Sequence, residues 1–265
     1  MDTTENAFYK KGWCKFSHDS AIEQWISEAL PLARNEVTSN AHKDWLRCGG
    51  TWFVGVNALP NNSDGVIGNS KPLSGKAVEF IRGMPELGNF DWDRAQISIC
   101  YPGYPAPSDA ETEQAFQFRK NRDSAHLDGL LPEGPERRRY LRETHGFILG
   151  IPMVEYSDDA SPLVVWEGSH EIIRTAFNQR FSGIAPNNWG NEDVTEHYQR
   201  IRKKVFDQCE KIIIHASPGE TFLIHRLSIH GIAPWKETAT AGSDGRMICY
   251  FRPDLSEPEK WLSVK

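Results

Sequence analysis

The chain has 265 residues, of which 39% are hydrophobic, 25% are charged, 21 are glycine and 16 are proline. This composition excludes a disordered or collagen-like chain and is typical of a globular protein with many turns. Thirty basic residues against 36 acidic ones give a formal net charge of −6, which argues against nucleic acid or an anionic membrane as a partner.

Apolar segments and cysteines indicate the compartment. The longest nearly unbroken apolar run, residues 147–154, is far shorter than the roughly 18–20 residues that span a bilayer. Residues 1–6 contain acidic side chains and no apolar segment follows them, which is unlike a signal peptide. The five cysteines are scattered and never paired as C-x-x-C, so we expect reduced thiols. These features predict a cytoplasmic protein.

Three helices are predicted, two of them in the first third of the chain. The first begins at a capping box, Ser20-Ala21-Ile22-Glu23, in which Ser20 caps the Glu23 N–H, and its apolar residues recur at helical spacing to about Val37. The second covers about 74–84 and the third about 192–209, each with one apolar stripe.

Most other periodic segments are typical of β-strands, because they are short, rich in β-branched or aromatic residues, and bounded by Gly, Pro or Asp. Strands that do not alternate with helices argue against a doubly wound parallel sheet and favour an antiparallel double-sheet barrel or jelly roll. In chain order the predicted strands are 95–101, 147–154, 163–166, 212–215, 221–225 and 247–252.

The tripeptide His126-Leu127-Asp128 is the first candidate for chemistry. Residues two apart in an extended segment point the same way, so one imidazole and one carboxylate can meet at one point. The pattern alone is weak, because His42-Lys43-Asp44 repeats it in what we take as a surface loop. A third ligand from another strand would complete a 2-His-1-carboxylate face, which suits non-heme Fe(II) oxygen chemistry. The segment 219–231, with two histidines, supplies that candidate.

From Gln96 to Arg252 the chain resembles the phytanoyl-CoA dioxygenase family of Fe(II)/2-oxoglutarate-dependent dioxygenases. The pieces that carry the resemblance occur in the family's order, which is more specific than any one of them. They are His126-Leu127-Asp128, the stretch 163–170 ending in Gly168-Ser169-His170, then Gly219-Glu220 with His225 and His230, and a basic residue beyond.

The resemblance implies that His126, Asp128 and His230 hold Fe(II), whereas His225 packs or supports the ligands. It implies 2-oxoglutarate as co-substrate, O2 as oxidant, and hydroxylation of a small organic molecule with release of succinate. It also implies an arginine on the distal carboxylate of 2-oxoglutarate, a role that suits a planar guanidinium. We assign Arg246, after a polar loop, and keep Arg252 as the alternative.

Other polar and aromatic residues have weaker functional interpretations. The basic run 137–139 with Arg142 is expected to be the solvated face of a short helix that begins at Pro135, although it could contact an anionic substrate. His170 is expected to be structural. Three aromatic residues are possible pocket residues, although such residues on strands usually belong to the core: Tyr101, Tyr104 and Trp166.

We therefore expect a mainly β protein with the double-stranded β-helix (jelly roll, cupin-like) fold and N-terminal helices packed on one sheet. A single domain is expected over 1–265, because ligands at 126, 128 and 230 draw both ends of the strand-rich region together. Within it, 1–94 would form a helical buttress, 95–255 the double-stranded β-helix core, and about 183–211 a helical insertion.

The predicted function is a non-heme iron, 2-oxoglutarate-dependent dioxygenase acting on a small molecule. The alternative is a non-catalytic cupin-like protein that binds a metal or a ligand. A zinc hydrolase with the same three ligands is disfavoured, because the sequence has no H-E-x-x-H glutamate to act as general base. The sequence identifies neither the substrate nor the oligomeric state.

Overall fold

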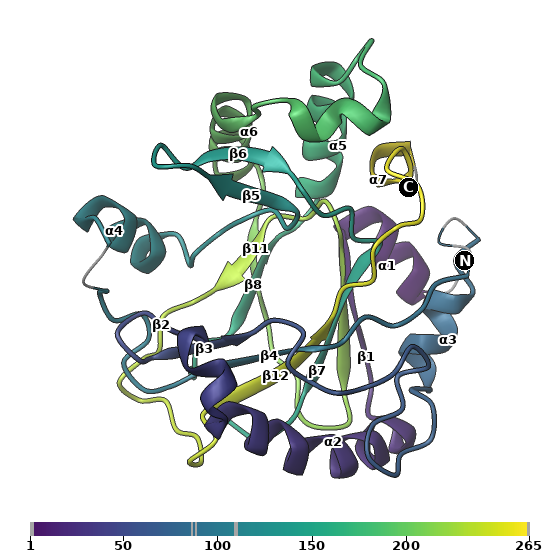
Figure 1. Cartoon of the computed structure of the whole chain (residues 1–265), viewed down its shortest axis with the longest axis vertical. Coiled ribbons are helices and arrows are strands. Elements are labelled where there is room, and N and C mark those ends of the chain that lie inside the picture. The colour runs from purple at the N-terminus through teal and green to yellow at the C-terminus, as the bar shows by residue number, and fades with distance from the viewer. Residues whose placement is uncertain (1–2, 86, 88, 109–110, 264–265) are drawn as a thin grey trace.

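A seven-stranded antiparallel sheet forms the main layer of the protein, with the strand order β1-β10-β7-β12-β4-β3-β2 (Figure 1). The computed structural model describes residues 3–85, 87, 89–108 and 111–263. The strands of this sheet are β1 (Trp13–Phe16), β2 (Leu46–Arg47), β3 (Trp52–Gly55), β4 (Gln96–Cys100), β7 (Phe147–Pro152), β10 (Thr221–His225) and β12 (Arg246–Phe251).

A second, three-stranded sheet has the order β11-β8-β9 and packs against the large one. Its strands are β8 (Leu163–Trp166), β9 (Lys211–Ile214) and β11 (His230–Ile232). Because strand residues alternate between two faces, each sheet turns one apolar row inward. This antiparallel double-sheet arrangement confirms the predicted jelly-roll architecture. Buried residues from both sheets fill the space between them: Ile148, Leu163, Val165, Phe222, Ile224 and Ile248.

Helices cover the outer faces of both sheets. On the large sheet, α2 (Ser20–Thr38) buries Trp25, whose ring lies 5.7 Å from that of Phe251 on β12. Burying each large apolar side chain of this kind contributes roughly 1.5–3 kcal/mol. The small sheet is covered by α5 (Ser169–Arg180) and α6 (Thr195–Gln208). The remaining helices are α1 (Thr3–Lys11), η1 (Asn40–Trp45), α3 (Lys76–Arg82), α4 (Glu113–Asn121), η2 (Pro186–Asn191) and α7 (Lys260–Ser263).

The three predicted helices and six predicted strands are all present, with ends shifted by a few residues. The N-terminal part also supplies β1, β2 and β3 to the large sheet, which the sequence analysis does not predict. These strands have two to four residues each, too few for a periodic pattern to stand out.

The predicted cap of α2 is wrong by one residue. Asp19 is the N-cap, with extended backbone angles, and its carboxylate accepts a hydrogen bond of 2.9 Å from the backbone N–H of Ala21. Ser20 is instead the first helical residue. The same carboxylate accepts a 2.8 Å bond from the backbone N–H of Lys76 at the start of α3, and this bond lowers the pKa of Asp19. One acidic side chain therefore satisfies the first turns of two helices.

The helix predicted after Pro135 is also wrong. Residues Arg138–Leu141 form strand β6, which pairs with β5 (Leu130–Glu133) in a separate hairpin. The turn between them holds Gly134 and Arg137 at φ values of 66° and 53°. Positive φ at these two positions reverses the chain and is incompatible with a right-handed helix.

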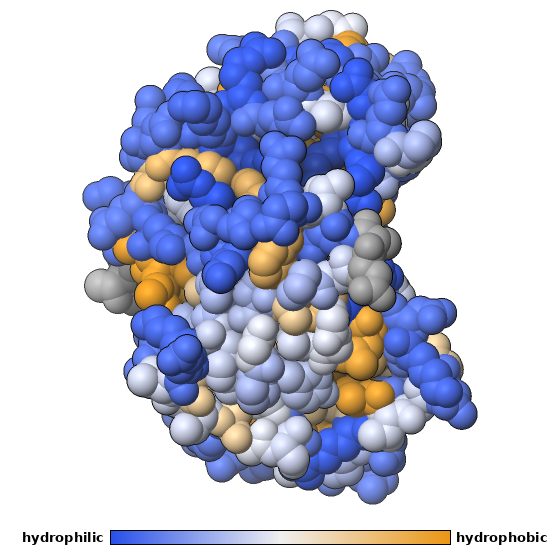
Figure 2. Space-filling view, turned by 90° about the vertical axis from the view of Figure 1, so that its left-hand side faces the viewer, coloured by the Kyte–Doolittle hydropathy of each residue, from blue (hydrophilic) through white to orange (hydrophobic). Residues whose placement is uncertain are grey.

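Among the described residues, the structure contains no helix long and apolar enough to span a membrane. Figure 2 shows one side of the surface, where hydrophilic side chains cover most of the upper part, at the level of α6 and the β5–β6 hairpin in Figure 1. Hydrophobic side chains on this face form small separate patches (Figure 2). Scattered patches of this kind are normal for a protein surface.

Candidate metal centre

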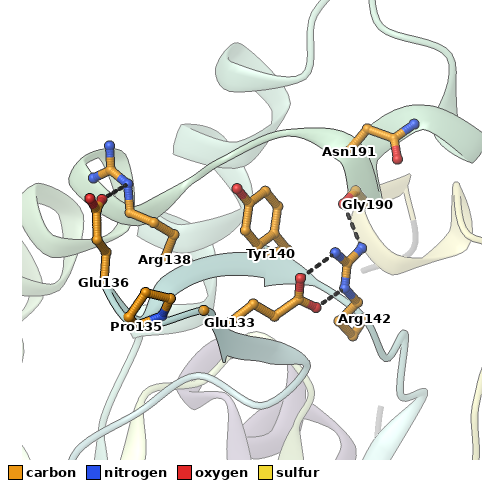
Figure 3. Close-up of a pocket in the computed structure, with 9 residues that line it drawn as sticks. Glu133, Pro135, Glu136, Arg138, Tyr140, Arg142, Gly190 and Asn191 are labelled. Atoms are coloured by element: carbon orange, nitrogen blue, oxygen red, sulfur yellow. Dashed lines mark hydrogen bonds and ion pairs between the residues drawn. The ribbon is translucent and has the colours of Figure 1, made fainter.

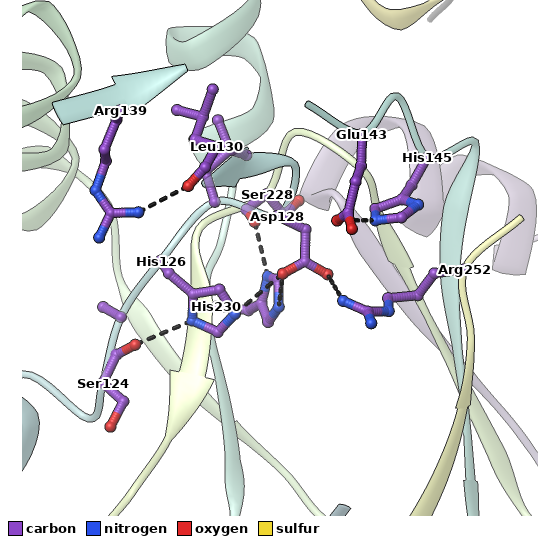
Figure 4. Close-up of polar contacts among 12 residues, drawn as sticks. Ser124, His126, Asp128, Leu130, Arg139, Glu143, His145, Ser228, His230 and Arg252 are labelled. Carbon is purple, nitrogen blue, oxygen red and sulfur yellow. Dashed lines mark hydrogen bonds and ion pairs between the residues drawn. The ribbon is translucent and has the colours of Figure 1, made fainter. Parts of the chain in front are cut away.

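His126, Asp128 and His230 converge on one point at the edge of the space between the two sheets (Figure 4). Their potential ligand atoms all lie within 4.8 Å of one another. Asp128 Oδ1 is 3.1 Å from Nε2 of His126 and 3.8 Å from Nε2 of His230. In the part of the chain that the structure describes, no other group of His, Cys, Asp or Glu side chains comes together in this way.

The backbone fixes the two histidines relative to each other. His126 and His230 form an antiparallel bridge, with N–H···O bonds of 2.9 Å and 3.1 Å. Gly231, next along β11, lies against the segment before His126, where a Cβ would come within 2.1 Å of the carbonyl oxygen of Asp123. Only glycine allows this close approach.

Each imidazole is oriented by a hydrogen bond to a backbone carbonyl. Nδ1 of His126 lies 3.0 Å from the carbonyl oxygen of Ser124, and Nδ1 of His230 lies 3.0 Å from that of Ser228 (Figure 4). Nδ1 must carry the proton to donate to a carbonyl, which leaves the lone pair on Nε2. Both Nε2 atoms therefore face the carboxylate in the form that binds a metal.

Arg252 holds the other oxygen of the carboxylate. Its Nη1 lies 3.2 Å from Asp128 Oδ2, which leaves Oδ1 directed toward the histidines. Burial alone would raise the pKa of Asp128, but the positive charge of Arg252 outweighs it and holds the pKa well below its usual range. The aspartate is therefore ionised at neutral pH and can serve as an anionic ligand.

His230 is neutral in the same environment. Burial and the neighbouring His126 lower the pKa of His230 to about 4. A neutral imidazole keeps its lone pair available. Two imidazole nitrogens and one carboxylate oxygen on one side of a point are the donor set of the 2-His-1-carboxylate face, which leaves positions open for other ligands. The residues present therefore fit Fe(II).

Arg246 is the first residue of β12, and Arg252 directly follows its last residue, Phe251. Side chains six residues apart along an extended segment project to the same side. Arg246 is 1% exposed, and its Nε and Nη1 have no hydrogen-bond partner among the described residues. Its guanidinium lies 5.8 Å from the ring centre of Tyr156. A buried cation with unpaired donors is costly unless a ligand satisfies it. Arg252, in contrast, already has Asp128 as partner.

A cavity of about 170 Å³ opens beside the three metal-binding candidates. Trp52 and Gln96 line it together with Arg252 and Tyr250, whereas Arg246 lies outside the lining. The sequence gives no signal for Trp52, because its place depends on β3 joining the large sheet. The three aromatic residues considered from the sequence, Tyr101, Tyr104 and Trp166, do not line this cavity. Tyr104 and Trp166 are buried, and Tyr101 is half-buried against the core.

Two other histidines of the sequence motifs lie apart from this cluster. The rings of His170 and His225 are 4.9 Å apart, and both residues are fully buried. His225 Nε2 lies 3.0 Å from Nη2 of Arg174, and His170 Nε2 lies 3.0 Å from the carbonyl oxygen of Tyr9. They belong to the packing between α1, α5 and β10.

Two arginines of the basic run, Arg138 and Arg142, line a different cavity, of about 600 Å³, at the β5–β6 hairpin (Figure 3). There Arg142 is paired with Glu133 and donates to the carbonyl oxygen of Gly190. Arg138 is paired with Asp193 at 2.9 Å and also contacts Glu136 and Glu196. These two arginines are already neutralised by neighbouring carboxylates, and none of the three metal-binding candidates lines this cavity.

No protein-family model and no curated protein matches this sequence. Among solved structures, the chain is similar to the non-heme alpha ketoglutarate dependent carbocyclase SnoK from nogalamycin biosynthesis, with a TM-score of 0.50 and 8% identity over 96% of this chain and 83% of that one. It is also similar to AviO1 from Streptomyces viridochromogenes Tue57, with a TM-score of 0.49 and 14% identity over 96% and 95% of the two chains. At these identities, the likeness to SnoK shows a shared fold. The chain thus combines that fold with a His-Asp-His cluster.

Proposed function

We propose that this protein is an Fe(II)- and 2-oxoglutarate-dependent oxygenase of the phytanoyl-CoA dioxygenase type, which hydroxylates a small organic molecule. The observation that carries the proposal is the convergence of His126, Asp128 and His230 with both Nε2 atoms and one carboxylate oxygen turned to the same point. The fold supports it, since SnoK is described as a non-heme alpha ketoglutarate dependent enzyme.

In this proposal, His126, Asp128 and His230 hold Fe(II), and Arg246 binds the distal carboxylate of 2-oxoglutarate. The metal and co-substrate supply the oxidising chemistry, in which O2 and 2-oxoglutarate convert a C–H bond to C–OH and yield succinate and CO2. The protein itself contributes orientation and exclusion of water. Arg252 keeps Asp128 ionised and fixes which oxygen faces the metal.

The unpaired nitrogens of Arg246 distinguish this proposal from a non-catalytic cupin-like protein. A protein that only binds a metal has no need of a second buried guanidinium, six residues before the one that contacts Asp128. A dicarboxylate co-substrate, in contrast, would bring carboxylate oxygens to accept hydrogen bonds from this guanidinium.

The test is binding of 2-oxoglutarate to Mn(II)-loaded protein by calorimetry, followed by succinate formation with Fe(II), ascorbate and O2. We expect wild-type protein to bind 2-oxoglutarate and to form succinate, even slowly without substrate. Arg246→Gln should bind 2-oxoglutarate at least tenfold more weakly while it keeps the metal. Absence of both 2-oxoglutarate binding and succinate formation in the metal-loaded wild type would refute the assignment.

A further inference from the structure

A second cavity, of about 450 Å³, adjoins the metal-site cavity across Trp52 and Val54 of β3, which line both. These two side chains project from the same face of the strand because they are two residues apart. Phe53, between them, points the other way into the core under α2. A molecule in the second cavity therefore lies against the wall of the metal site. We call it the basic cavity, after the three arginines that line it: Arg47, Arg119 and Arg137.

One of these arginines is already neutralised. Arg119 forms an ion pair with Glu111, which also lines the cavity, and both side chains are less than a fifth exposed. Arg119 Nη1 further contacts Sγ of Cys48 at 2.9 Å. This pair closes one wall of the cavity and leaves the net charge there to the other two arginines.

Arg47 and Arg137 have no carboxylate partner within the described part of the chain. The guanidinium of Arg47 lies 5.7 Å from the ring centre of Trp45, another cavity residue. Both residues are exposed. The protein as a whole has a net charge of −6, so these two cations give the hollow a charge opposite in sign to that of the whole chain. A concave site with one sign of charge concentrates ions of the opposite sign.

Arg137 reaches the cavity from a backbone conformation that arginine seldom adopts. Its φ is 53°, at a hairpin turn where glycine or asparagine would be favoured. A residue kept in a sparsely populated region points to a role for its side chain. The next residue, Arg138, is paired with Asp193 and does not line this cavity. Arg137 lines the cavity and has no ion-pair partner among the described residues.

Apart from the hydroxyl groups of Ser108 and Thr112, the rest of the lining is apolar or aromatic. Trp45 and Trp52 offer flat rings, and Val54 and Ala115 offer aliphatic surface. Arg246, the proposed anchor of 2-oxoglutarate, lies outside this cavity, so the co-substrate does not account for its charge. The basic cavity is therefore matched to a molecule with one anionic end and a flat or apolar body.

We propose that the basic cavity binds the substrate of this enzyme, and that the substrate is an organic anion, a carboxylate or a phosphate ester, with an apolar body. Arg47 and Arg137 hold the anionic group, and the body lies along Trp52 and Val54 toward the metal. The identification of the occupant as the substrate rests on the proposed function. The selection of organic anions by the basic cavity rests only on the side chains that line it.

The experiment is calorimetric binding of matched naphthalene compounds to the full-length protein, with and without Mn(II). The carboxylate is 1-naphthoate, with 1-naphthamide as its neutral partner, and the phosphate ester is 1-naphthyl phosphate, with 1-naphthol as its neutral partner. We expect at least one anion to bind tenfold or more tightly than its neutral partner, and the better of the two identifies the anionic group. Arg47→Gln/Arg137→Gln should abolish this preference.

The matched control is Arg138→Gln/Arg142→Gln, which removes two charges from the same hairpin outside the basic cavity. It should change the preference less than twofold. Three results would overturn the inference: equal binding of anions and neutral partners by the wild type, undetectable binding of both anions, or an equal loss of the preference in the control variant.

Binding of 2-oxoglutarate is measured in parallel. Its absence beside a retained anion preference contradicts the proposed function alone, whereas its presence without the preference contradicts only this inference.

Discussion

His126 and His230 donate a backbone hydrogen bond to each other, at 2.9 Å and 3.1 Å, so two candidate ligands distant in sequence form one antiparallel pair. The position of Asp128 follows, because it is two residues beyond His126 and its Oδ1 lies 3.1 Å from the His126 Nε2. The three donors are thus placed by one backbone contact and one short turn.

Metal binding should depend on His126 and not on the second H-x-D tripeptide. His42 in that tripeptide lies on η1 and pairs with Glu36 at 2.9 Å, away from the cluster. We expect His126→Ala to lower the affinity for Mn(II) or Fe(II) by at least roughly tenfold. Loss of a residue that only orients a metal ligand already costs about this much, and loss of a ligand itself should cost no less. His42→Ala should match the wild type by metal analysis after dialysis. Equal metal content in the two variants would contradict the ligand assignment.

Gly231→Ala should destabilise the protein and disturb the metal centre together. The new Cβ would meet the carbonyl oxygen of Asp123 at 2.1 Å, a backbone atom that cannot move without displacing the segment before His126. We expect a loss of roughly 2–4 kcal/mol in the free energy of unfolding, measured in urea. Gly242→Ala, with open space around the new Cβ, is the control and should stay within about 0.5 kcal/mol of the wild type. Similar values for the two variants would argue against this close approach.

Asp19→Ala should cost more stability than Ser20→Ala. The Asp19 carboxylate accepts hydrogen bonds from two helix starts, whereas Ser20 is the first residue of α2 and does not cap it. Loss of an N-cap costs about 0.5–2 kcal/mol, and we expect the upper end here. Thermal or urea unfolding measures both variants. A larger effect of Ser20→Ala would restore the capping box that the sequence suggests.

His145 should make the stability depend on pH in the alkaline range. Burial alone would lower its pKa, but contacts with Asp254 at 3.1 Å and Glu143 at 3.0 Å outweigh it and raise the pKa to about 9. A raised pKa in the folded state stabilises the protein fully below about pH 6.5, and that stabilisation is lost as the pH rises through 9. The shift corresponds to roughly 3 kcal/mol.

The free energy lost in His145→Gln should therefore be larger at pH 6 than at pH 10. Urea unfolding of both proteins at the two pH values gives the difference. A loss that is the same at both pH values would show that the histidine acts by packing and not by charge.

Local patterns in the sequence predict the regular strands and the ligand tripeptide. The strand at β7 is a run of six buried residues, and His126 and Asp128 lie close enough in sequence for a period-two argument. What the sequence does not show depends on partners far along the chain. Examples are the contact of Arg252 with Asp128 and the place of Trp52 in the cavity wall. The hairpin that replaces the helix predicted after Pro135 is a local error, because Arg137 in its turn adopts a positive φ that its residue type does not indicate.

Arg246, which begins β12, and Arg252, which directly follows it, also bear on how this protein can be altered. The strand lies between β4 and β7 and is hydrogen-bonded to both, so its register is fixed on two sides. A slip of one residue would turn Arg246 and Arg252 out of the barrel together. The polar loop 237–245 that leads into the strand is held by the ion pair of Asp244 with Arg34 and by the backbone bridge of Ala241 with Tyr156. A designed insertion in this loop must keep these two contacts, because one that shifts the register of the strand would displace both guanidinium groups at once.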